Sequence, residues 1–531
     1  MSRRRRCARA QAGQSRVSRM KLLRRRTRMA KGSRPITTAV ATTVAALASF
    51  GMTTAAGTDP ALAAESTRND VHGLGAASSR CDDPHTLPSA PDHLTDVAGT
   101  LFFTADDDTH GSELWKSDGT DSGTVLVKDI NPTNDYYGYG GPDDLTDVEG
   151  TLFFTADDDI HGRELWKSDG TEQGTVLVKD IGQEYQNGRV DDLTAVGSTL
   201  FFTADDGTHG EELWKSDGTE KGTVLVKDIH THDGSYYGPD YLTAVGATLY
   251  FAANDGKRGQ ELWKSDGTTS GTVLVRDILP NYPSSDPRHL TAVGETLFFT
   301  ADAKYGRQLW KSDGTKSGTK LVKVIDRTYE YGSPEDLTAV QGVLFFTADD
   351  GTHGRELWKS DGTHSGTVLV RDIDPDDEYD GGLSGLTDVG RTLFFAADDG
   401  TDGRELWKSD GSESGTVLVK NINPADYSSN PVNLTAVGDI VFFTAGDGTH
   451  GPEVWKSNGK KAGTVLVKDI HPCAMHESPS GLTDVGGALF FAADDGYHGQ
   501  ELWTSDGTRS GTDLVKDINT KRPDDGVTPA E

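Results

Sequence analysis

The chain has 531 residues, with 63 glycines, 34% hydrophobic residues and a formal net charge of −31. This length exceeds one ordinary hydrophobic core, so the chain either forms several domains or repeats one unit. Its acidity excludes the basic surface that nucleic-acid-binding proteins use, and it disfavours contact with anionic membranes. An acidic surface keeps a secreted protein dispersed, and it also suits divalent cations or cationic partners.

Residues 1–64 are predicted to be a signal peptide. They hold 14 Lys or Arg residues and a single acid, Asp59, and an apolar stretch at 36–52 leads to the small-residue sequence TDPALAAES. This order of charged, apolar and small-residue regions is typical of secretion. We expect cleavage after Ala63 or Ala64, release of the mature chain and no membrane insertion. The mature chain then has 38 basic and 82 acidic residues, a net charge of −44.

Nine similar units follow, and each is marked by one tryptophan. The tryptophans stand 47 to 51 residues apart, at 115, 166, 214, 263, 310, 358, 407, 455 and 503. Each lies 15 residues before a closing isoleucine, whereas the stretch from that isoleucine to the next Leu-Thr pair varies. Constant units joined by variable linkers predict a repeat fold over 92–520. An N-terminal extension at 65–91 precedes it, and a disordered tail at 521–531 follows it.

Each unit divides into four short strands, as the third copy illustrates. The expected strands are residues 192–196, 199–205, 212–216 and 223–229. Asp and Gly cluster between them, and both residues suit tight turns because Asp bonds the nearby backbone and Gly tolerates positive φ. The repeats show no helical period. The sequence therefore predicts an all-β protein.

The second expected strand has two apolar faces. It places Leu200 and Phe202 on one face and Phe201 on the other, so an isolated sheet would be unstable in water. Sheets arranged in a ring cover one another, and Trp214 would fill the space between neighbours. We therefore predict a β-propeller of nine four-stranded blades. Rings of about 4 to 8 blades are usual, so an open β-repeat array or a solenoid is the alternative.

The phrase ADDGTHGRELWKSDGTHSGTVLVRDI at 348–373 resembles the ELWxxDGT repeat family of secreted bacterial proteins. The resemblance covers about residues 92–520, where Glu-Leu-Trp, Asp-Gly-Thr and Gly-Thr recur in most units. It implies an extracellular, propeller-like protein and brings no activity with it. The departures from the pattern are Gln308, Ser412, Val454, Asn458 and Lys460.

The variable linkers carry most of the tyrosines. In a propeller whose first strand is innermost, these linkers share one face with the turns between the second and third strands. Twelve of the fifteen tyrosines lie in the linkers, where they suit stacking on a sugar or contact with a protein. The other interpretation is that each tyrosine packs its own linker against a blade. The candidate ligand-binding residues are Tyr136, Tyr137, Tyr236, Tyr237, Tyr329 and Tyr331.

The turn after the second strand raises the question of calcium. In the third unit it presents Asp205, Asp206, His209 and Glu212. Calcium prefers six to eight oxygens, but the alternating acids of established calcium loops are missing. Ordinary turn chemistry is therefore favoured. We predict no cofactor, with calcium as the alternative, which melting with and without a chelator would decide.

Two cysteines survive removal of the signal, since Cys7 leaves with it. Cys81 precedes the first blade, and Cys473 lies in the linker between the eighth and ninth units. In a closed ring these places are neighbours, and an even pair in an oxidising compartment favours a disulfide across the seam. The alternative is a zinc site made by His471, Cys473 and His476.

These observations favour a secreted, non-catalytic binding or scaffold protein whose partner is an extracellular glycan or protein. Catalysis needs a distinctive cluster of tuned groups, and nearly every acid here belongs to a repeated pattern. The isolated candidates His230, His232 and Asp233 have no identifiable partner. The alternatives are an extracellular glycan hydrolase or lyase that uses carboxylates at the ring centre, and a cation-dependent adhesive protein.

Overall fold

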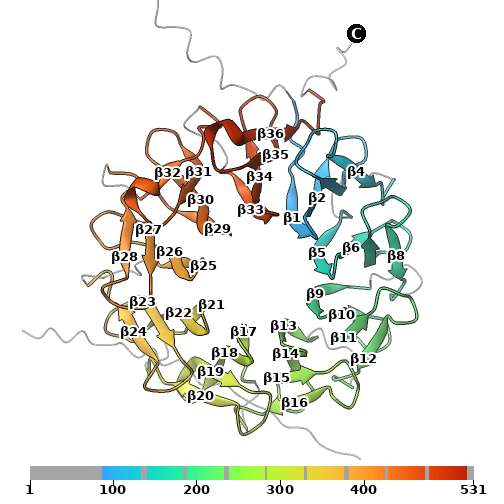
Figure 1. Cartoon of the computed structure of the whole chain (residues 1–531). Coiled ribbons are helices and arrows are strands. Elements are labelled where there is room, and N and C mark those ends of the chain that lie inside the picture. Colours follow the sequence, from blue (N-terminus) through green and yellow to red (C-terminus); the bar gives the residue numbers. More distant parts are fainter. Residues whose placement is uncertain are drawn as a thin grey trace, which may run out of the picture. The chain divides into compact units, whose positions relative to one another are not determined.

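The computed structural model describes residues 86–132, 140–182, 188–231, 238–280, 284–327, 332–375, 382–424, 428–472 and 478–522. Nine four-stranded antiparallel sheets form a ring of blades around an open centre (Figure 1). The predicted nine-bladed, all-β propeller is thus confirmed. The helical elements of the described part are two 3-10 turns, η1 Lys461–Gly463 and η2 Arg509–Gly511. No helix in these ranges is long and apolar enough to cross a membrane.

Each blade is made of four consecutive strands, and we number the blades 1 to 9 in chain order. The inner strands are β1 Asp92–Val97, β5 Asp143–Val148, β9 Asp191–Val196, β13 Asp240–Val245, β17 Arg288–Val293, β21 Glu335–Val340, β25 Ser384–Val389, β29 Val432–Val437 and β33 Ser480–Val485. The second strands are β2 Thr100–Asp106, β6 Thr151–Asp157, β10 Thr199–Asp205, β14 Thr248–Asn254, β18 Thr296–Ala303, β22 Val343–Asp349, β26 Thr392–Ala397, β30 Ile440–Gly446 and β34 Ala488–Asp494.

The other two strands of each blade lie further from the centre. The third strands are β3 Ser112–Ser117, β7 Arg163–Ser168, β11 Glu211–Ser216, β15 Gln260–Ser265, β19 Gly306–Ser312, β23 Arg355–Ser360, β27 Glu405–Ser409, β31 Pro452–Ser457 and β35 Gln500–Ser505. The outer strands are β4 Val125–Lys128, β8 Val176–Lys179, β12 Val224–Lys227, β16 Val273–Arg276, β20 Lys320–Lys323, β24 Val368–Arg371, β28 Val417–Lys420, β32 Val465–Leu466 and β36 Thr512–Lys516.

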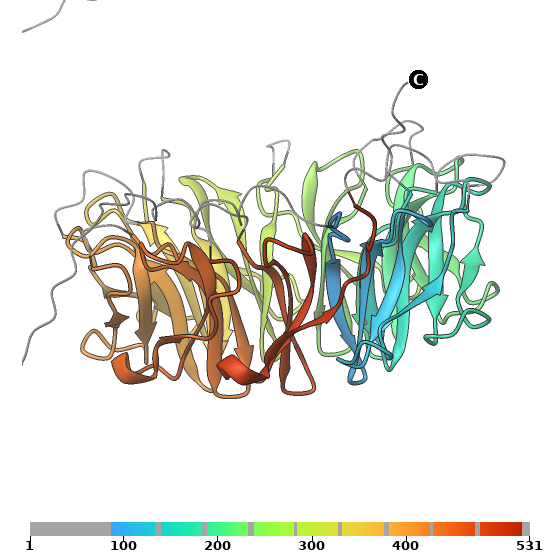
Figure 2. The ribbon, with the colours of Figure 1, turned by 90° about the horizontal axis from the view of Figure 1, so that it is seen from above.

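The ring has two different faces, which are the upper and lower edges in Figure 2. We call the face where the inner strands begin and the second strands end the linker-side face, and the other the opposite face. The end of one linker reaches the end of a second strand, because the Asp205 amide donates to the Gly188 oxygen at 2.8 Å. The predicted meeting of the linkers with the turns between the second and third strands is therefore confirmed.

Neighbouring blades are joined by a buried apolar cluster. Between blades 2 and 3, Phe153 and Leu165 of one blade pack with Phe202 and Trp214 of the next. Both apolar faces of the second strand are buried in this way, as the alternation in its sequence predicts. A cluster of the same kind lies at each of the other interfaces, including that between blades 9 and 1.

Polar contacts join the blades on either side of this cluster. Near the centre, the Thr194 hydroxyl donates to the Leu242 oxygen of the next blade at 3.4 Å. At the perimeter, the Lys179 ammonium donates to the Thr223 oxygen at 3.0 Å and lies 5.7 Å from the centroid of the Trp214 ring. A cation over an indole face is favourable. The lysine of the repeated unit thus connects one blade to the next.

The repeated Ser-Asp-Gly-Thr phrase builds the turn between the third and outer strands. Ser216 Oγ lies 2.8 Å from Thr223 Oγ1, and Asp217 Oδ1 accepts hydrogen bonds from both the amide and the hydroxyl of Thr219. A Cβ atom on Gly222 would lie 2.0 Å from Asp217 Oδ1, so glycine is required there. The sequence motifs that recur along the chain are therefore explained by hydrogen bonds within turns and by contacts between blades.

Gly218→Ala is expected to destabilise the protein by about 2 kcal/mol, because Gly218 has φ +80° and its Cβ would lie 3.1 Å from Phe153 Cζ of the preceding blade. The control is Gly197→Ala, since Gly197 also has positive φ (+59°) but nothing within 4 Å of a Cβ. It should lose only the backbone contribution, about 1 kcal/mol. Urea unfolding of both variants measures the difference, and equal losses would show that the Phe153 contact costs nothing.

The ring closes without exchange of a strand between the first and last blades, as the phase of the repeats predicts. The contacts between neighbouring blades are repeated at this seam. The Thr483 hydroxyl of blade 9 donates to the Leu94 oxygen of blade 1 at 3.3 Å, and the Lys516 ammonium donates to the Thr124 oxygen at 3.0 Å. The interface between blades 9 and 1 is therefore of the same kind as the others.

Residues 86–90, which we call the latch, bind blade 9 before the chain enters blade 1. The Leu87 amide donates to the Lys521 oxygen at 2.8 Å, and the Ser89 hydroxyl donates to Glu501 at 2.6 Å. The linkers into blades 5 and 8 place a serine in the same way, with Ser285 on Glu261 at 2.7 Å and Ser429 on Glu405 at 2.6 Å. The latch thus takes the place of a linker between blades 9 and 1.

Candidate functional site

The linker-side face carries residues that differ from blade to blade. Three of its positions vary: the first two residues of the inner strand and the residue three places before the tryptophan. Turns on the opposite face vary as well, for example at Glu220 and Lys316, but the linker-side positions also border two cavities. Function in a repeat protein is sought where one unit differs from the next, because residues shared by all units are explained by packing. These positions and the linkers form the candidate site.

The second residue of every inner strand has a left-handed backbone, with φ between 52° and 70°. The ladder to the second strand shifts register beside it, which marks a β-bulge. Asp, Asn, His and Gly tolerate this backbone better than other residues. The bulge ring, as we call it, consists of His93, Asp144, Asp192, Tyr241, His289, Asp336, Gly385, Asn433 and Gly481.

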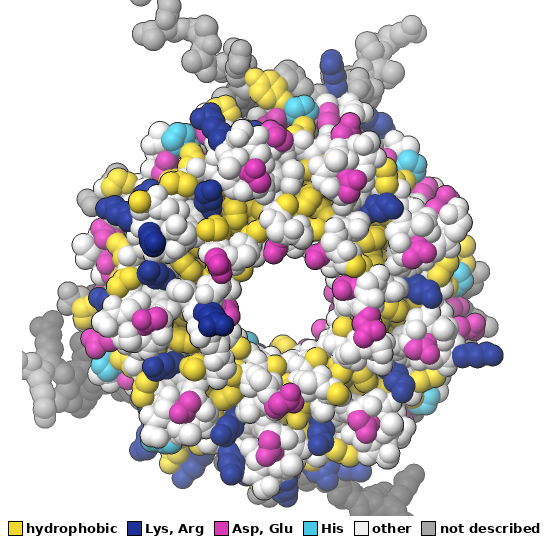
Figure 3. All heavy atoms as spheres, viewed as in Figure 1, with side chains coloured by type: hydrophobic (Ala, Val, Ile, Leu, Met, Phe, Trp, Pro, Cys, Tyr) yellow, Lys and Arg dark blue, Asp and Glu magenta, His cyan; other side chains and the backbone are white. Residues whose placement is uncertain are grey.

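The charges at the variable positions change around the ring. In blades 2 to 4 the acids are Asp143, Asp144, Asp191, Asp192, Glu211 and Asp240. Blades 5 to 7 carry Arg288, Arg307, Arg355 and Arg404 together with the acids Glu335 and Asp336, and blades 8 and 9 carry no charge at these positions. Figure 3 shows the open centre of the ring from the opposite face. The site therefore has an acidic arc and a neutral arc, so it can orient a ligand.

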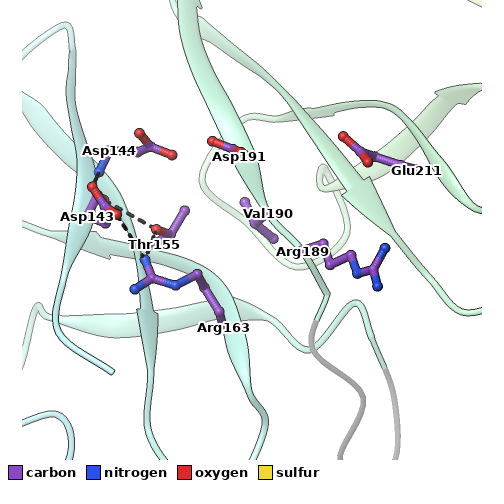
Figure 4. A pocket seen from close by; sticks show the side chains of 8 residues that line it. All are labelled: Asp143, Asp144, Thr155, Arg163, Arg189, Val190, Asp191 and Glu211. Carbon is purple, nitrogen blue, oxygen red and sulfur yellow. Dashed lines mark hydrogen bonds and ion pairs between the residues drawn. The ribbon is translucent and has the colours of Figure 1, made fainter. Parts of the chain in front are cut away.

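A cavity of about 300 Å³ lies in the acidic arc between blades 2 and 3 (Figure 4). Arg163 lies at its wall, where its guanidinium donates to Thr155 Oγ1 at 2.7 Å and to the Gly141 oxygen at 3.1 Å. A carboxylate oxygen of Asp143 lies 3.7 Å from the same guanidinium. The lining residues are Asp143, Asp144, Thr155, Arg163, Arg189, Val190, Asp191 and Glu211.

Carboxyl groups crowd together in this cavity and raise one another's pKa. Burial, a hydrogen bond with Asp191 and the charges of Asp143 and Asp192 raise the pKa of Asp144 to about 7. Burial and the charges of Asp191 and Asp240 raise the pKa of Asp192 to about 6. Asp144 and Asp192 are therefore protonated to a larger extent near neutral pH than an exposed Asp would be.

A second cavity, of about 490 Å³, lies at the corresponding place in blade 8. Its walls include Asn430 of the incoming linker, Val432 of β29, Thr444 of β30 and Pro452 of β31. No charged side chain lines it among the described residues. The same position in the repeat thus forms a charged cavity in one arc and a neutral cavity in the other.

The glutamate of the repeated Glu-Leu-Trp holds the start of each outgoing linker. Glu212, which is 1% exposed, accepts the amides of Ile229 and His230 at 2.9 and 2.8 Å. Burial raises its pKa to about 7, although these hydrogen bonds act in the opposite direction. Burial also raises the pKa of Glu113, Glu164, Glu261, Glu356, Glu453 and Glu501 to about 7.

In the turn considered above as a calcium site, the carboxylate oxygens accept hydrogen bonds from within the turn itself. Asp205 accepts the Gly207 amide at 2.8 Å, while Asp206 accepts the amides of Thr208 and His209 and lies 2.8 Å from His209 Nδ1. This pairing raises the pKa of His209 and lowers that of Asp206, where backbone and side-chain hydrogen bonds outweigh burial. No group of three His, Cys, Asp or Glu residues suited to a metal occurs in the described ranges. The absence of a cofactor stays a prediction, with calcium as its alternative.

The ligand-binding residues predicted from sequence fall outside the described ranges. This applies to Tyr136, Tyr137, Tyr236, Tyr237, Tyr329 and Tyr331, and also to Cys81 and Cys473. Among the linker tyrosines Tyr241 is described, and it is an exposed member of the bulge ring. The bulge itself was missed from the sequence, because only the variation at the start of the inner strand marks it.

The described residues nearest the two cysteines reach the same turn of blade 9. The Thr86 amide donates to the Tyr497 oxygen at 3.1 Å. The ring of His471 lies against Gly496, since a Cβ there would be 2.8 Å from His471 Nε2. The Cys81–Cys473 disulfide itself lies outside the described ranges and stays a prediction.

The secreted chain is expected to have an intact mass that is two hydrogens lower than that of the reduced chain. The disulfide removes one hydrogen from each cysteine, and reduction followed by alkylation should then label two thiols. A chain that reacts with a thiol reagent before reduction would contradict the disulfide. Zinc released on thiol modification would instead favour the site at His471, Cys473 and His476.

No protein-family model matches the chain, and no curated protein matches it. Solved structures do match in part. A puromycin hydrolase is 14% identical over 66% of this chain and 56% of its own, with a TM-score of 0.34. A prolyl endopeptidase is 16% identical over 62% and 48%, with a TM-score of 0.37. Prolyl oligopeptidase B from Galerina marginata is 13% identical over 69% and 55%, with a TM-score of 0.38. The chain thus covers about half the length of these enzymes.

Proposed function

We propose that the protein is an extracellular binding or scaffold protein of the ELWxxDGT repeat type, which recognises a glycan or a protein on the linker-side face. The observation that carries this proposal is that repeated and variable residues have different roles within each unit. Trp214, Lys179, Gly222 and Glu212 of the repeated phrases are engaged in interface, turn and linker contacts. On the linker-side face, variable side chains at the start of the inner and third strands border two cavities, where they can contact a partner without altering the blades.

The predicted signal peptide at 1–64 and the cysteine pair support export of the chain. An exported chain meets extracellular glycans and proteins, and these are therefore the proposed partners. The change from an acidic arc to a neutral arc supports recognition of a partner that contacts several blades at once. Such a surface gives affinity through many modest contacts and specificity through their order around the ring.

Binding is tested with the secreted chain on glycan arrays and in capture from culture supernatant. The variant Tyr236→Ala, Tyr237→Ala changes the linker of blade 3 and is expected to weaken binding at least about tenfold, as loss of an aromatic contact does at an interface. The matched control is Glu220→Ala, Lys221→Ala, which changes an exposed turn on the opposite face of the same blade. If both variants bound equally well, Tyr236 and Tyr237 would not be part of the binding site.

One observation favours a second candidate, a glycan hydrolase or lyase. Asp144 and Asp191 face each other across the charged cavity, and Asp144 has a pKa of about 7. A carboxyl group that is protonated near neutral pH beside an ionised one is what general acid catalysis requires. Release of sugar from a polysaccharide by the chain, and its loss in Asp144→Asn, would establish this activity.

A further inference from the structure

The cavity in blade 8 lies where four other blades hold an arginine side chain. Pro452, three residues before Trp455, borders this cavity at the start of β31. Arginine occupies the same position in blades 2, 5, 6 and 7, as Arg163, Arg307, Arg355 and Arg404. The repeated architecture therefore provides four examples of what this place can hold.

The four guanidinium groups are bound in one recurring way. Each donates to the backbone oxygen two residues before the inner strand of its own blade. The acceptors are Gly141, Asp286, Ser333 and Gly382, at 3.1, 2.7, 3.1 and 2.7 Å. In three blades a threonine hydroxyl of the second strand also accepts, and these are Thr155, Thr300 and Thr347, at 2.7, 3.4 and 3.2 Å.

Blade 8 keeps these acceptors but supplies no arginine. Asn430 stands two residues before β29, and Thr444 stands at the threonine position of β30. Both line the cavity. The Thr444 hydroxyl donates its own hydrogen to the Pro479 oxygen at 3.0 Å, so its lone pairs can accept a hydrogen bond. Because proline has no long side chain, the space that a guanidinium occupies elsewhere is left as a cavity.

Three of the four guanidinium groups also lie near a carboxylate, at 3.7, 2.7 and 3.4 Å, but the fourth indicates that this partner is not needed. In blade 7, Arg404 donates to the Gly382 oxygen and to Ser384 Oγ, both of which are uncharged. A guanidinium is weakly hydrated and presents a planar set of donors, so it binds to backbone oxygens that an ammonium ion fits less well. The net charge of the chain, −31, also draws a cation toward the ring.

We propose that the cavity of blade 8 binds an arginine side chain of a partner protein. The guanidinium would donate to the Asn430 oxygen and to Thr444 Oγ1, as the arginines of the other blades do at their own acceptors. This proposal rests on the proposed binding function and specifies its partner as a protein with an exposed arginine. It also places the contact in the neutral arc, away from the carboxyl groups of blades 2 to 4.

The probe is N-acetyl-arginine amide, titrated into the whole chain and followed by ligand-observed NMR. We expect saturable binding with a Kd of about 1 mM, because one side chain makes few contacts. Pro452→Arg fills the cavity from within and should weaken binding at least tenfold. Pro452→Ser, which reproduces Ser112 of blade 1, leaves the cavity open and should bind as the parent does. N-acetyl-lysine amide should bind at least tenfold more weakly than the arginine probe.

A second variant keeps the proposal testable if Pro452→Arg fails to fold. Thr444→Ala removes one acceptor and should weaken the arginine probe at least threefold, and alanine already stands at this position in Ala252, Ala396 and Ala492. The proposal is overturned if the parent chain shows no saturable binding, or if Pro452→Arg or Thr444→Ala binds as the parent does.

Failure of this proposal can be distinguished from failure of the proposed function. A protein captured on the linker-side face whose affinity is unchanged by Pro452→Arg would overturn the arginine pocket and leave the binding function intact. Binding of the probe by a chain that captures neither a glycan nor a protein would establish the pocket and contradict the wider function.

Discussion

Removal of residues 1–91 is expected to lower the free energy of unfolding by about 5 kcal/mol relative to a chain that begins at residue 86, at about 1 kcal/mol for each hydrogen bond lost. The bonds that join the latch to blades 9 and 1 include these five: the amides of Thr86 and Leu87 donate to Tyr497 and Lys521, the amide and the hydroxyl of Ser89 donate to Glu501, and the Asp106 amide donates to the Ser89 oxygen. Glu501 is fully buried, so loss of the serine leaves it short of a donor. Urea unfolding compares the two chains.

The chain that begins at residue 86 is itself the control, since it lacks the predicted signal and retains the latch. Small-angle scattering reports the accompanying change of shape, because a ring weakened at one interface opens there first. Equal stability of the two chains would mean that the contacts between blades 9 and 1, such as Thr483 to Leu94, close the ring by themselves.

The effect of Glu212→Gln on the free energy of unfolding is expected to be about 2.5 kcal/mol more favourable at pH 8 than at pH 5. The pKa of Glu212 is about 7 in the folded chain and 4.5 in the reference state. A raised carboxyl pKa means that folding favours the neutral form, so its stabilisation is complete below pH 4.5 and is lost as the pH rises to about 7. The amide is neutral throughout and avoids this loss.

Blade 5 already contains the variant, which shows that the amide fits. Gln308 accepts the Ile325 amide at 2.8 Å, and its nitrogen donates to the oxygens of Tyr305 and Asp326 at 3.1 and 3.0 Å. In blade 3, by contrast, the two oxygens of Glu212 accept the amides of Ile229 and His230, so the amide variant keeps one of these acceptors and loses the other at every pH. In the described part of the chain, one oxygen of Glu113, of Glu261 and of Glu356 is buried without a hydrogen-bond partner.

The measurement is urea unfolding of parent and variant between pH 4.5 and 8. Glu220→Gln, in an exposed turn of the same blade, is the matched control and should leave the curve of stability against pH unchanged. Parallel curves for the parent and Glu212→Gln would show that the pKa of Glu212 is the same in the folded and unfolded chains.

The architecture could be predicted because one period carries it nine times. The strands expected at 199–205 and 212–216 correspond to β10 Thr199–Asp205 and β11 Glu211–Ser216. Alternation of Leu200, Phe201 and Phe202 was sufficient to indicate sheets covered on both faces, and hence a ring. Because the geometry follows from the linker length and the strand order, the common face of linkers and turns could be predicted as well.

The details of the site could not be predicted in the same way. Asp144 is separated from Asp191 by almost a whole unit in sequence, and only the ring brings them together. The left-handed backbone at Asp192 leaves no mark in the sequence beyond a residue that tolerates it. The buried role of Glu212 was hidden, because an acid beside a turn reads as a solvent-exposed residue. The latch could not be predicted, because residues 86–90 do not match the repeated sequence pattern.

The equivalence of all blade interfaces, the seam included, has a consequence for inheritance. Near-identical copies in a gene invite unequal recombination, which deletes or duplicates whole copies in frame. Since each sheet consists of four consecutive strands and meets its neighbours through the same contacts, a shortened or lengthened descendant would meet only junctions that already exist. The number of blades can therefore change by whole units under selection. The diameter of the central opening changes with it, without a new interface having to evolve.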